Sequence, residues 1–229
     1  MGGGQLNYLL RLRGSSSGIV DLAGNSITNH NVDYTSTPSS LGGGTALKFN
    51  GSNAYLDIEP LSKYIEAGED YTVSIQVLTS IPIINKPINS IYPYFLFFQE
   101  SGSSQTASLY YQSGTARPPG VFFSNGRYGD YIIDFLYDQM RSLSSYHLTF
   151  VRKNNVITMY VNGTACSNPL TNSGQFNDIN DTLRIGYNPF TSLPYKYADY
   201  TIDDFCIIKG KALWTSNFTP PTSYLPDKI

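Results

Sequence analysis

The feature that most constrains this chain is a series of short runs in which apolar and polar residues alternate. Between Tyr71 and Val77 every odd-numbered residue is apolar and every residue between them is polar. A period of two is typical of a β-strand whose two faces meet different surroundings. The chain is therefore expected to fold by pairing strands into sheets.

Similar runs, bounded by turn-forming residues, recur along the whole sequence, whereas short helices are expected only at Pro60–Ile65 and Asp138–Leu143. Residues 13–44 are rich in Gly, Ser and Asn and are interpreted as a loop-rich connection. The expected strands are Tyr8–Leu12, Thr45–Asn50, Ala54–Ile58, Tyr71–Thr79, Tyr94–Glu100, Ala107–Gln112, Gly120–Phe123, Asp130–Tyr137, Tyr146–Arg152, Val156–Val161, Leu183–Gly186 and Tyr200–Ile208. About a dozen short antiparallel strands predict an all-β fold, a two-sheet jelly-roll sandwich.

No Pro/Gly-rich linker or change of composition divides the 229 residues in the middle. We therefore expect one sandwich domain over residues 6–229, with residues 1–5 as a linker or N-terminal tail. Two small sandwiches would need such a break.

The balance of charge excludes some classes of partner. The formal net charge is −2 and the sequence pI is about 5.6, so the surplus of Lys and Arg that binding to nucleic acid needs is absent. The longest apolar runs, Ile81–Ile84 and Tyr94–Phe98, are too short to insert into a membrane. Residues 1–18 lack the pattern of a signal peptide. Cys166 and Cys206 do not have a metal-binding spacing and are expected to be buried free thiols.

Several segments resemble one family when they are taken in order. They are the Asp-x-x-Gly loop at Asp21–Gly24, the stretch Gly43–Leu56, the hairpin Tyr146–Gly163 and the tail Gly210–Pro221. Together they resemble the concanavalin A-like lectin/glucanase superfamily, in particular the laminin-G-like jelly-roll domain found in phage tail and structural proteins. Gln76 stands where that family normally has Trp, which is a departure from its pattern.

The tail and the turns also have a physical interpretation. Asn50-Gly51 and Asn162-Gly163 tolerate positive φ and are expected to form tight turns. Pro220-Pro221 cannot donate ladder hydrogen bonds, so the chain must leave the sheet there. Trp214 and Phe218 are expected to pack down as hydrophobic anchors of that exit.

A glycan-cleaving enzyme is disfavoured. The resemblance implies that catalysis would use Glu-x-Asp-x-x-Glu, and the four glutamates, Glu59, Glu66, Glu69 and Glu100, do not stand in it. Asp130 and Asp134 share a face next to Arg127, which is interpreted as a solvated face rather than a catalytic pair. His147 belongs to the hairpin and is interpreted as structural. We therefore expect no enzyme activity.

Three aspartates are candidate ligands for Ca²⁺. The resemblance implies calcium near the rim of the sheet, and the matching candidates are Asp21, Asp203 and Asp204. Asp203 is expected to share its face with Phe205 and Ile207, and a carboxylate there must be paired, hydrogen-bonded or bound to a cation. The alternative is that Asp203 accepts backbone N–H bonds in a loop.

Aromatic loops are the candidate ligand-binding surface, because aromatic faces pack on the C–H faces of sugars and planar polar groups bind their hydroxyls. Such loops occur at Asn89–Tyr94, Arg117–Pro119, Asn125–Tyr131 and Tyr187–Tyr197. The candidate residues are Tyr92, Tyr94, Arg127, Tyr128, Tyr131, Tyr195 and Tyr197. Ordinary sheet packing and contact with a neighbouring subunit are the alternatives.

The sequence thus predicts a non-enzymatic, lectin-like binding module. The resemblance implies a tail-associated component of a phage virion that attaches to the host through cell-surface carbohydrate. A purely structural decoration or joining protein, which contacts other virion proteins or a second copy of the chain, is the first alternative. A glycan-cleaving enzyme is the second.

Overall fold

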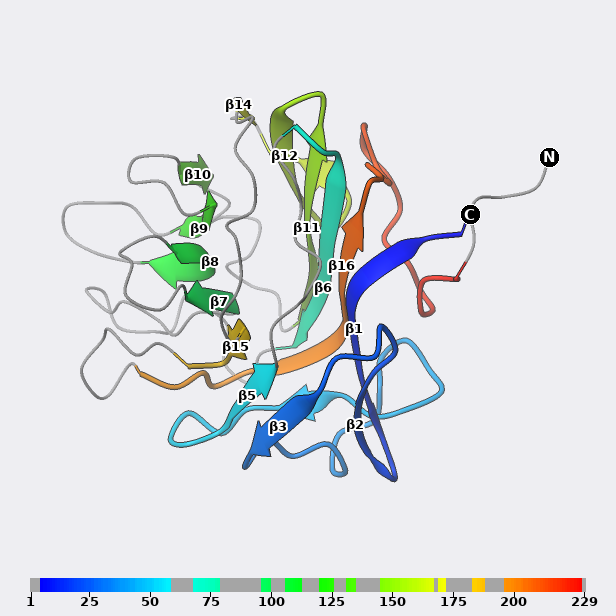
Figure 1. The fold of residues 1–229 in the computed structure, drawn as a ribbon, viewed down its shortest axis with the longest axis vertical. Helices are drawn as coiled ribbons and strands as arrows, with labels where there is room; N and C mark the ends of the chain where they lie inside the picture. Colours follow the sequence, from blue (N-terminus) through cyan, green and yellow to red (C-terminus); the bar gives the residue numbers. More distant parts are fainter. Residues whose placement is uncertain are drawn as a thin grey trace.

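The computed structural model of the protein describes residues 5–58, 68–78, 96–99, 106–112, 120–125, 131–134, 145–166, 169–171, 183–187 and 196–227. The regular structure in this part of the chain is β-strand, arranged in two antiparallel sheets (Figure 1). The predicted all-β, two-sheet fold is confirmed. None of the described residues forms a helix that could span a membrane. The two predicted short helices lie outside the described residues.

The first sheet has nine strands in the order β13-β12-β11-β6-β16-β1-β2, with β14 beside β12 and β4 beside β16. The strands are β1 (Asn7–Ser15), β2 (Gly18–Asp21), β4 (Leu47–Lys48), β6 (Tyr71–Leu78), β11 (Ser145–Lys153), β12 (Val156–Val161), β13 (Thr164–Ala165), β14 (Leu170–Thr171) and β16 (Thr201–Lys209). Because β1 pairs with β16, strands from the two ends of the chain lie side by side (Figure 1).

The second sheet has seven strands in the order β10-β9-β8-β7-β15-β5-β3. They are β3 (Ile27–His30), β5 (Tyr55–Ile58), β7 (Leu96–Gln99), β8 (Thr106–Gln112), β9 (Gly120–Asn125), β10 (Tyr131–Asp134) and β15 (Leu183–Ile185). Most of the predicted strands therefore exist, with ends shifted by a few residues.

The core lies between the sheets and is filled from both. In β6, Val73, Ile75 and Val77 are at most 1% exposed. Leu56 and Ile58 of β5 are completely buried in the same apolar cluster. The alternation in the sequence therefore sorts these side chains as predicted, with the apolar face of each strand toward the other sheet.

The outer face of the first sheet is covered by the segment that follows β16. The Thr72 hydroxyl donates a hydrogen bond to the carbonyl oxygen of Lys211 at 2.9 Å. Trp214 and Phe218 stack on each other with ring centroids 4.3 Å apart, and both rings meet His147 edge-on, at 5.9 and 6.0 Å. The predicted anchoring role of Trp214 and Phe218 is confirmed.

The two cysteines also behave as expected. Cys166 and Cys206 are free and buried. Burial raises the pKa of the Cys206 thiol well above its ordinary value, and the neighbouring Asp204 carboxylate raises it further. The thiol is therefore held neutral in an apolar layer.

The tight turns have the predicted backbone conformation. Gly51, Asn162 and Gly163 have φ of 72°, 47° and 77°. In the β11–β12 hairpin, Asn154 and Asn155 also have positive φ, at 50° and 66°. Two consecutive residues of this kind form the turn whose twist matches that of the paired strands.

β2 and β3 lie within the stretch 13–44, which the sequence predicts to be a loop-rich connection. Each is the last strand at one edge of its sheet, and most of their residues are partly or fully exposed. Only Ile19 and Ile27 of these strands pack against the core, so the strands lack the apolar alternation by which the other strands were identified.

A β-bulge interrupts β16 opposite β6, since the register shifts between Asp203 and Cys206. Asp204 has φ of 40° at this point. Because the bulge adds a residue, Phe205 and Ile207 face the core between the sheets while Asp203 does not. The predicted common face for these three residues is wrong, since a period of two does not survive a bulge.

Burial of His147 predicts a pH-dependent stability. His147 is 5% exposed, and burial lowers its pKa to about 4. Between pH 6.5 and 4 the unfolded chain therefore binds more protons than the folded one, so stability is full above pH 6.5 and falls as the pH drops, by about 3 kcal/mol in total.

Urea unfolding at pH 7, 5.5 and 4 measures this loss. The variant His147→Gln is expected to lose less stability over that range. The control variant His30→Gln, at a histidine whose side chain is 33% exposed, should lose as much stability as the wild type. Equal pH dependence in wild type and His147→Gln would contradict the assignment.

The turn at Gly163 supports a second prediction. A Cβ there would lie 1.8 Å from the carbonyl oxygen of Phe218, whereas a Cβ at Gly42, with φ of 82°, would have no atom within 4 Å. Gly42→Ala is therefore expected to cost about 1 kcal/mol from backbone strain alone, and Gly163→Ala about 3 kcal/mol or more. Chemical denaturation compares the two, and equal losses would show that the tail does not pack on this turn.

Candidate functional site

The candidate site lies on the outer face of the second sheet, where β3, β5 and β15 are neighbours. In β5, Leu56 and Ile58 face the core, so Tyr55 and Asp57 project from the opposite face. The strand pairing places His30 opposite Tyr55 and Arg184 opposite Asp57. Four side chains from three strands are thereby gathered on one face.

Two more tyrosines join this face just beyond β15. Tyr187 pairs with Tyr197 in an isolated β-bridge, and the amide of Ala198 donates to the carbonyl oxygen of Gly186 at 2.8 Å. Gly186 has φ of 85°, and a Cβ there would meet the Phe49 ring at 2.4 Å. Glycine is required at this close approach, which turns the chain so that Tyr187 and Tyr197 lie together.

Tyr55, Tyr187 and Tyr197 form what we call the tyrosine cluster. The ring centroid of Tyr55 is 5.0 Å from that of Tyr187, and Tyr197 lies 5.1 Å from Tyr187. His30 stacks on Tyr55 at 4.1 Å with an interplanar angle of 7°. Since β5 lies between β3 and β15, His30 and Tyr187 flank Tyr55 from opposite sides.

The Tyr197 ring lies beside both of the other tyrosines, with its centroid 5.1 Å from Tyr187 and 6.2 Å from Tyr55. Both of these ring contacts are tilted, with interplanar angles of 41° to Tyr187 and 38° to Tyr55. Within the described residues Tyr197 has no stacked partner. Tyr55, Tyr187 and Tyr197 are all partly exposed, so the cluster combines a fixed position with access from solvent.

Charged groups surround the rings. Arg184 Nε donates to Asp57 Oδ1 at 2.9 Å, and His30 Nε2 is 3.3 Å from Asp57 Oδ2. Arg184 Cζ and Lys196 Nζ lie 5.6 and 5.1 Å from the Tyr187 ring centroid. A hydrogen bond with Tyr187 raises the pKa of Lys196 above its ordinary value, so the ammonium keeps its charge.

The local environment also affects the phenol of Tyr55. Burial raises its pKa above the ordinary value, and the charge of Asp57 acts in the same direction. The hydroxyl therefore stays protonated at neutral pH and can donate a hydrogen bond to a ligand.

The structure brings one of the predicted ligand-binding residues, Tyr197, into this site. Tyr131 is the first residue of β10, at the edge of the sheet away from β5, with β9, β8 and β7 between β10 and β15. Tyr92, Tyr94, Arg127, Tyr128 and Tyr195 lie outside the described residues, as does Asp130.

The site residues that the sequence did not predict are His30, Tyr55, Asp57 and Arg184. The alternation Tyr55–Ile58 carried a usable signal, because it places Tyr55 and Asp57 away from the core. His30 lies in a segment interpreted as loop, so nothing in the sequence indicated its neighbours.

Asp21, one of the predicted calcium ligands, organises the loop after β2. Its Oδ1 accepts from the backbone N–H groups of Arg11 at 2.8 Å and Ala23 at 3.0 Å. Its Oδ2 accepts from the N–H of Asn25 at 3.1 Å. The Asp-x-x-Gly motif is thus an Asx-type turn in which the carboxylate replaces a missing ladder partner.

Asp203 is likewise held by hydrogen bonds. Its Oδ2 accepts from the Ser39 hydroxyl at 2.7 Å and from the Ser40 N–H at 2.9 Å. Asp204 pairs with Arg13 Nε at 3.2 Å and accepts from the N–H of Leu225 at 3.2 Å. Together the two carboxylates fasten loops onto the bulge in β16.

No three His, Cys, Asp or Glu side chains in the described part of the chain are grouped as a metal site would require. The geometry therefore assigns Asp21, Asp203 and Asp204 hydrogen-bonding roles. Of the open alternatives, it favours the one in which Asp203 accepts bonds from a loop.

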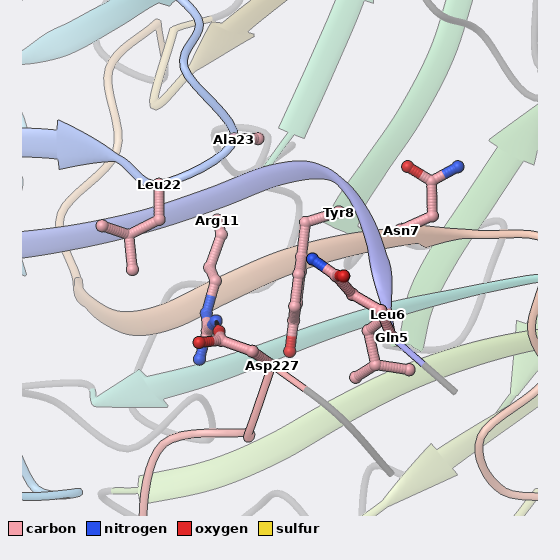
Figure 2. A pocket seen from close by; sticks show the side chains of 8 residues that line it. All are labelled: Gln5, Leu6, Asn7, Tyr8, Arg11, Leu22, Ala23 and Asp227. Carbon is pink, nitrogen blue, oxygen red and sulfur yellow. Dashed lines mark hydrogen bonds and ion pairs between the residues drawn. The ribbon is translucent and has the colours of Figure 1, made fainter. Parts of the chain in front are cut away.

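A pocket of about 480 Å³ lies on the other sheet, beside the start of β1 (Figure 2). Arg11 points into it and pairs with Asp227, and its second terminal nitrogen donates to the carbonyl oxygen of Leu225. The Tyr8 hydroxyl donates to the carbonyl oxygen of Pro226 at 2.9 Å. These polar groups connect residues 225–227 to β1. The polar side chains that line the pocket therefore have a structural role.

The comparisons with known proteins concern the fold. No family model and no curated protein matches the sequence. Among solved structures, the chain is similar to domain 4 of AbnA, an extracellular GH43 arabinanase from Geobacillus stearothermophilus, solved in complex with arabinotriose. The TM-score is 0.60 at 15% identity, covering 91% of this chain and 95% of that domain.

The other similar structures are binding domains of toxins. The binding domain of Paraclostridial Mosquitocidal Protein 1 has a TM-score of 0.64 at 16% identity. The receptor-binding domain of botulinum neurotoxin D has a TM-score of 0.61 at 14% identity. Each comparison covers 91% of this chain but 50% of the toxin domain, so the chain spans about half of those structures. These likenesses establish a shared fold.

The aspartate geometry yields a test of the calcium prediction. If the three carboxylates serve as hydrogen-bond acceptors, the melting temperature should be the same in millimolar calcium and in chelator. A rise of several degrees in calcium would show that they ligate the ion instead, because a ligand bound to the folded state stabilises it by mass action. Asp203→Asn should cost about 1–3 kcal/mol in either condition, since it replaces an acceptor by a donor.

Proposed function

We propose that this chain is a non-catalytic carbohydrate-binding module and that the tyrosine cluster is its binding surface. The observation that carries the proposal is the group of three partly exposed, mutually contacting rings beside Asp57 and Arg184 on the outer face of a sheet. The fold shared with a domain solved in complex with arabinotriose and with receptor-binding domains supports a binding role.

The chemistry of the cluster suits a sugar. The apolar C–H face of a pyranose packs on an aromatic ring, and Tyr197 is the ring without a stacked neighbour among the described residues. Planar side chains such as Arg184 and Asp57 bind vicinal hydroxyls in pairs. A rigid platform costs little ordering entropy on binding, and the β-bridge between Tyr187 and Tyr197 provides that rigidity.

The same cluster is poorly suited to cleaving a glycosidic bond. Such cleavage uses two carboxyl groups on either side of the bond. Among the described residues beside the cluster we find one carboxylate, Asp57, and it is already paired with Arg184 and His30. The geometry supports holding a ligand rather than transforming it.

The biological setting of the proposal comes from the sequence. The ordered motifs from Asp21 to Pro221 resemble laminin-G-like domains of phage tail and structural proteins. On that basis we assign the module to a phage virion, as a tail-associated adhesin for cell-surface glycan. A structural joining protein, with the tyrosine cluster against another subunit, is the outcome that the following experiment must exclude.

Tyr197→Ala is expected to weaken glycan binding about tenfold, because it removes the ring on which the sugar packs. Tyr197→Phe keeps the ring and should bind within about threefold of wild type. A glycan array identifies the ligand, and calorimetry measures the affinity of each variant. Unchanged melting temperatures exclude loss of fold.

Two results would contradict the proposal. One is equal affinity of wild type and Tyr197→Ala for the same glycan. The other is silence on the array combined with self-association that Tyr197→Ala abolishes, which would favour the structural role.

A further inference from the structure

We propose that the glycan bound by the tyrosine cluster is acidic, so that a carboxylate or sulfate group of the ligand lies between Lys196 and Arg184. This inference rests on the proposed function and specifies the class of ligand. Its basis is a local excess of positive charge at the cluster that no described carboxylate neutralises.

The segment of sequence that carries Tyr187 and Tyr197 has one sign of charge. From Ile185 to Ala198 the chain contains no Asp or Glu, and its one charged residue is Lys196. Arg184 directly precedes this stretch. The nearest following acid, Asp199, lies against the turn at Gly51. A chain with formal net charge −2 thus presents two permanent cations at one place.

The carboxylate within the site is insufficient to neutralise both cations. Asp57 is bound by Arg184 Nε at 2.9 Å and approached by His30 Nε2 at 3.3 Å. Lys196 contacts Tyr187 and forms no ion pair with any described carboxylate. Among the described residues, one of the two positive charges therefore has no carboxylate to balance it.

The remaining donors of Arg184 are also available. Its hydrogen bond to Asp57 uses Nε, and its terminal nitrogens have no hydrogen bond among the described residues. The side chain is 31% exposed. Guanidinium nitrogens in this state form paired, charge-assisted bonds to carboxylate or sulfate oxygens.

Both cations border the same ring. Arg184 Cζ and Lys196 Nζ each lie within 6 Å of the Tyr187 centroid. Two like charges around one ring repel each other, and an anionic group seated there would attract both. An acidic sugar that packs on Tyr197 would place such a group beside Tyr187, since the two rings are 5.1 Å apart.

The test compares matched glycans that differ in charge. Three pairs serve as probes: polygalacturonate and its methyl ester, hyaluronate and its carboxyl-reduced form, and dextran sulfate and dextran. Wild type is expected to bind the acidic member of at least one pair about tenfold more tightly than the neutral one. Raising NaCl from 50 to 500 mM should weaken the acidic ligand and leave the neutral one unchanged.

Variants distinguish the contribution of the Tyr197 ring to affinity from that of the Lys196 charge. Lys196→Gln should reduce the acidic-to-neutral ratio severalfold, because it lowers the affinity for the acidic member more than that for the neutral one, whereas Tyr197→Ala weakens both members of a pair. Lys153→Gln, at an exposed lysine beside the β11–β12 turn, is the matched control and should keep the wild-type ratio. The pairs that carry carboxylate and sulfate distinguish the two anionic groups.

The outcomes that overturn the two proposals differ. Equal affinity of wild type for the acidic and neutral members would reject an acidic ligand and leave carbohydrate binding intact. A ratio that Lys153→Gln lowers as much as Lys196→Gln would reject Lys196 as the cause. Failure to bind any acidic member, with neutral glycans still bound on an array, rejects the inference alone, and failure on every glycan rejects the proposed function with it.

Discussion

The packing of the two sheets against each other is the constraint on which the rest of the structure depends. Val73, Ile75 and Val77 of the first sheet and Leu56 and Ile58 of the second are essentially inaccessible to solvent. Because side chains alternate along a strand, burying one set fixes the other set on the outer face. The positions of Tyr55, Asp57 and Arg184 at the candidate site follow from this requirement, so the site is built on rigid strands.

The outer faces of the two sheets differ in how far the rest of the chain covers them. On the first sheet the outward residues are covered by the chain after β16, where Trp214 and Phe218 stack over His147. On the second sheet the outward residues around β5 and β15 stay partly exposed. An aromatic surface that the fold leaves open is more informative about function than one that it covers with its own tail.

The sequence was sufficient to predict the two-sheet fold, but it predicted only part of the candidate site. Strands with a buried face, such as β6, and turns such as Asn162-Gly163 follow from periodicity and local conformation. The bulge at Asp204 and the edge strands β2 and β3 do not, because no local pattern marks them. Most of the site was not predicted for a related reason. The register of the paired strands brings His30, Tyr55 and Arg184 together, and a single sequence does not specify that register. Tyr197 was found because it lies in an aromatic loop.

The most direct test of the account follows the tyrosine rings themselves. Ring resonances of the 19 tyrosines can be recorded by NMR while an oligosaccharide selected on the array is titrated in. If the tyrosine cluster binds the glycan, the largest shifts should fall on Tyr197, Tyr187 and Tyr55. Tyr8, in β1, and Tyr224, which packs on Arg13 of β1, should be unaffected. Shifts confined to Tyr8 and Tyr224, or a bound glycan that leaves the three cluster rings unchanged, would contradict binding at the cluster.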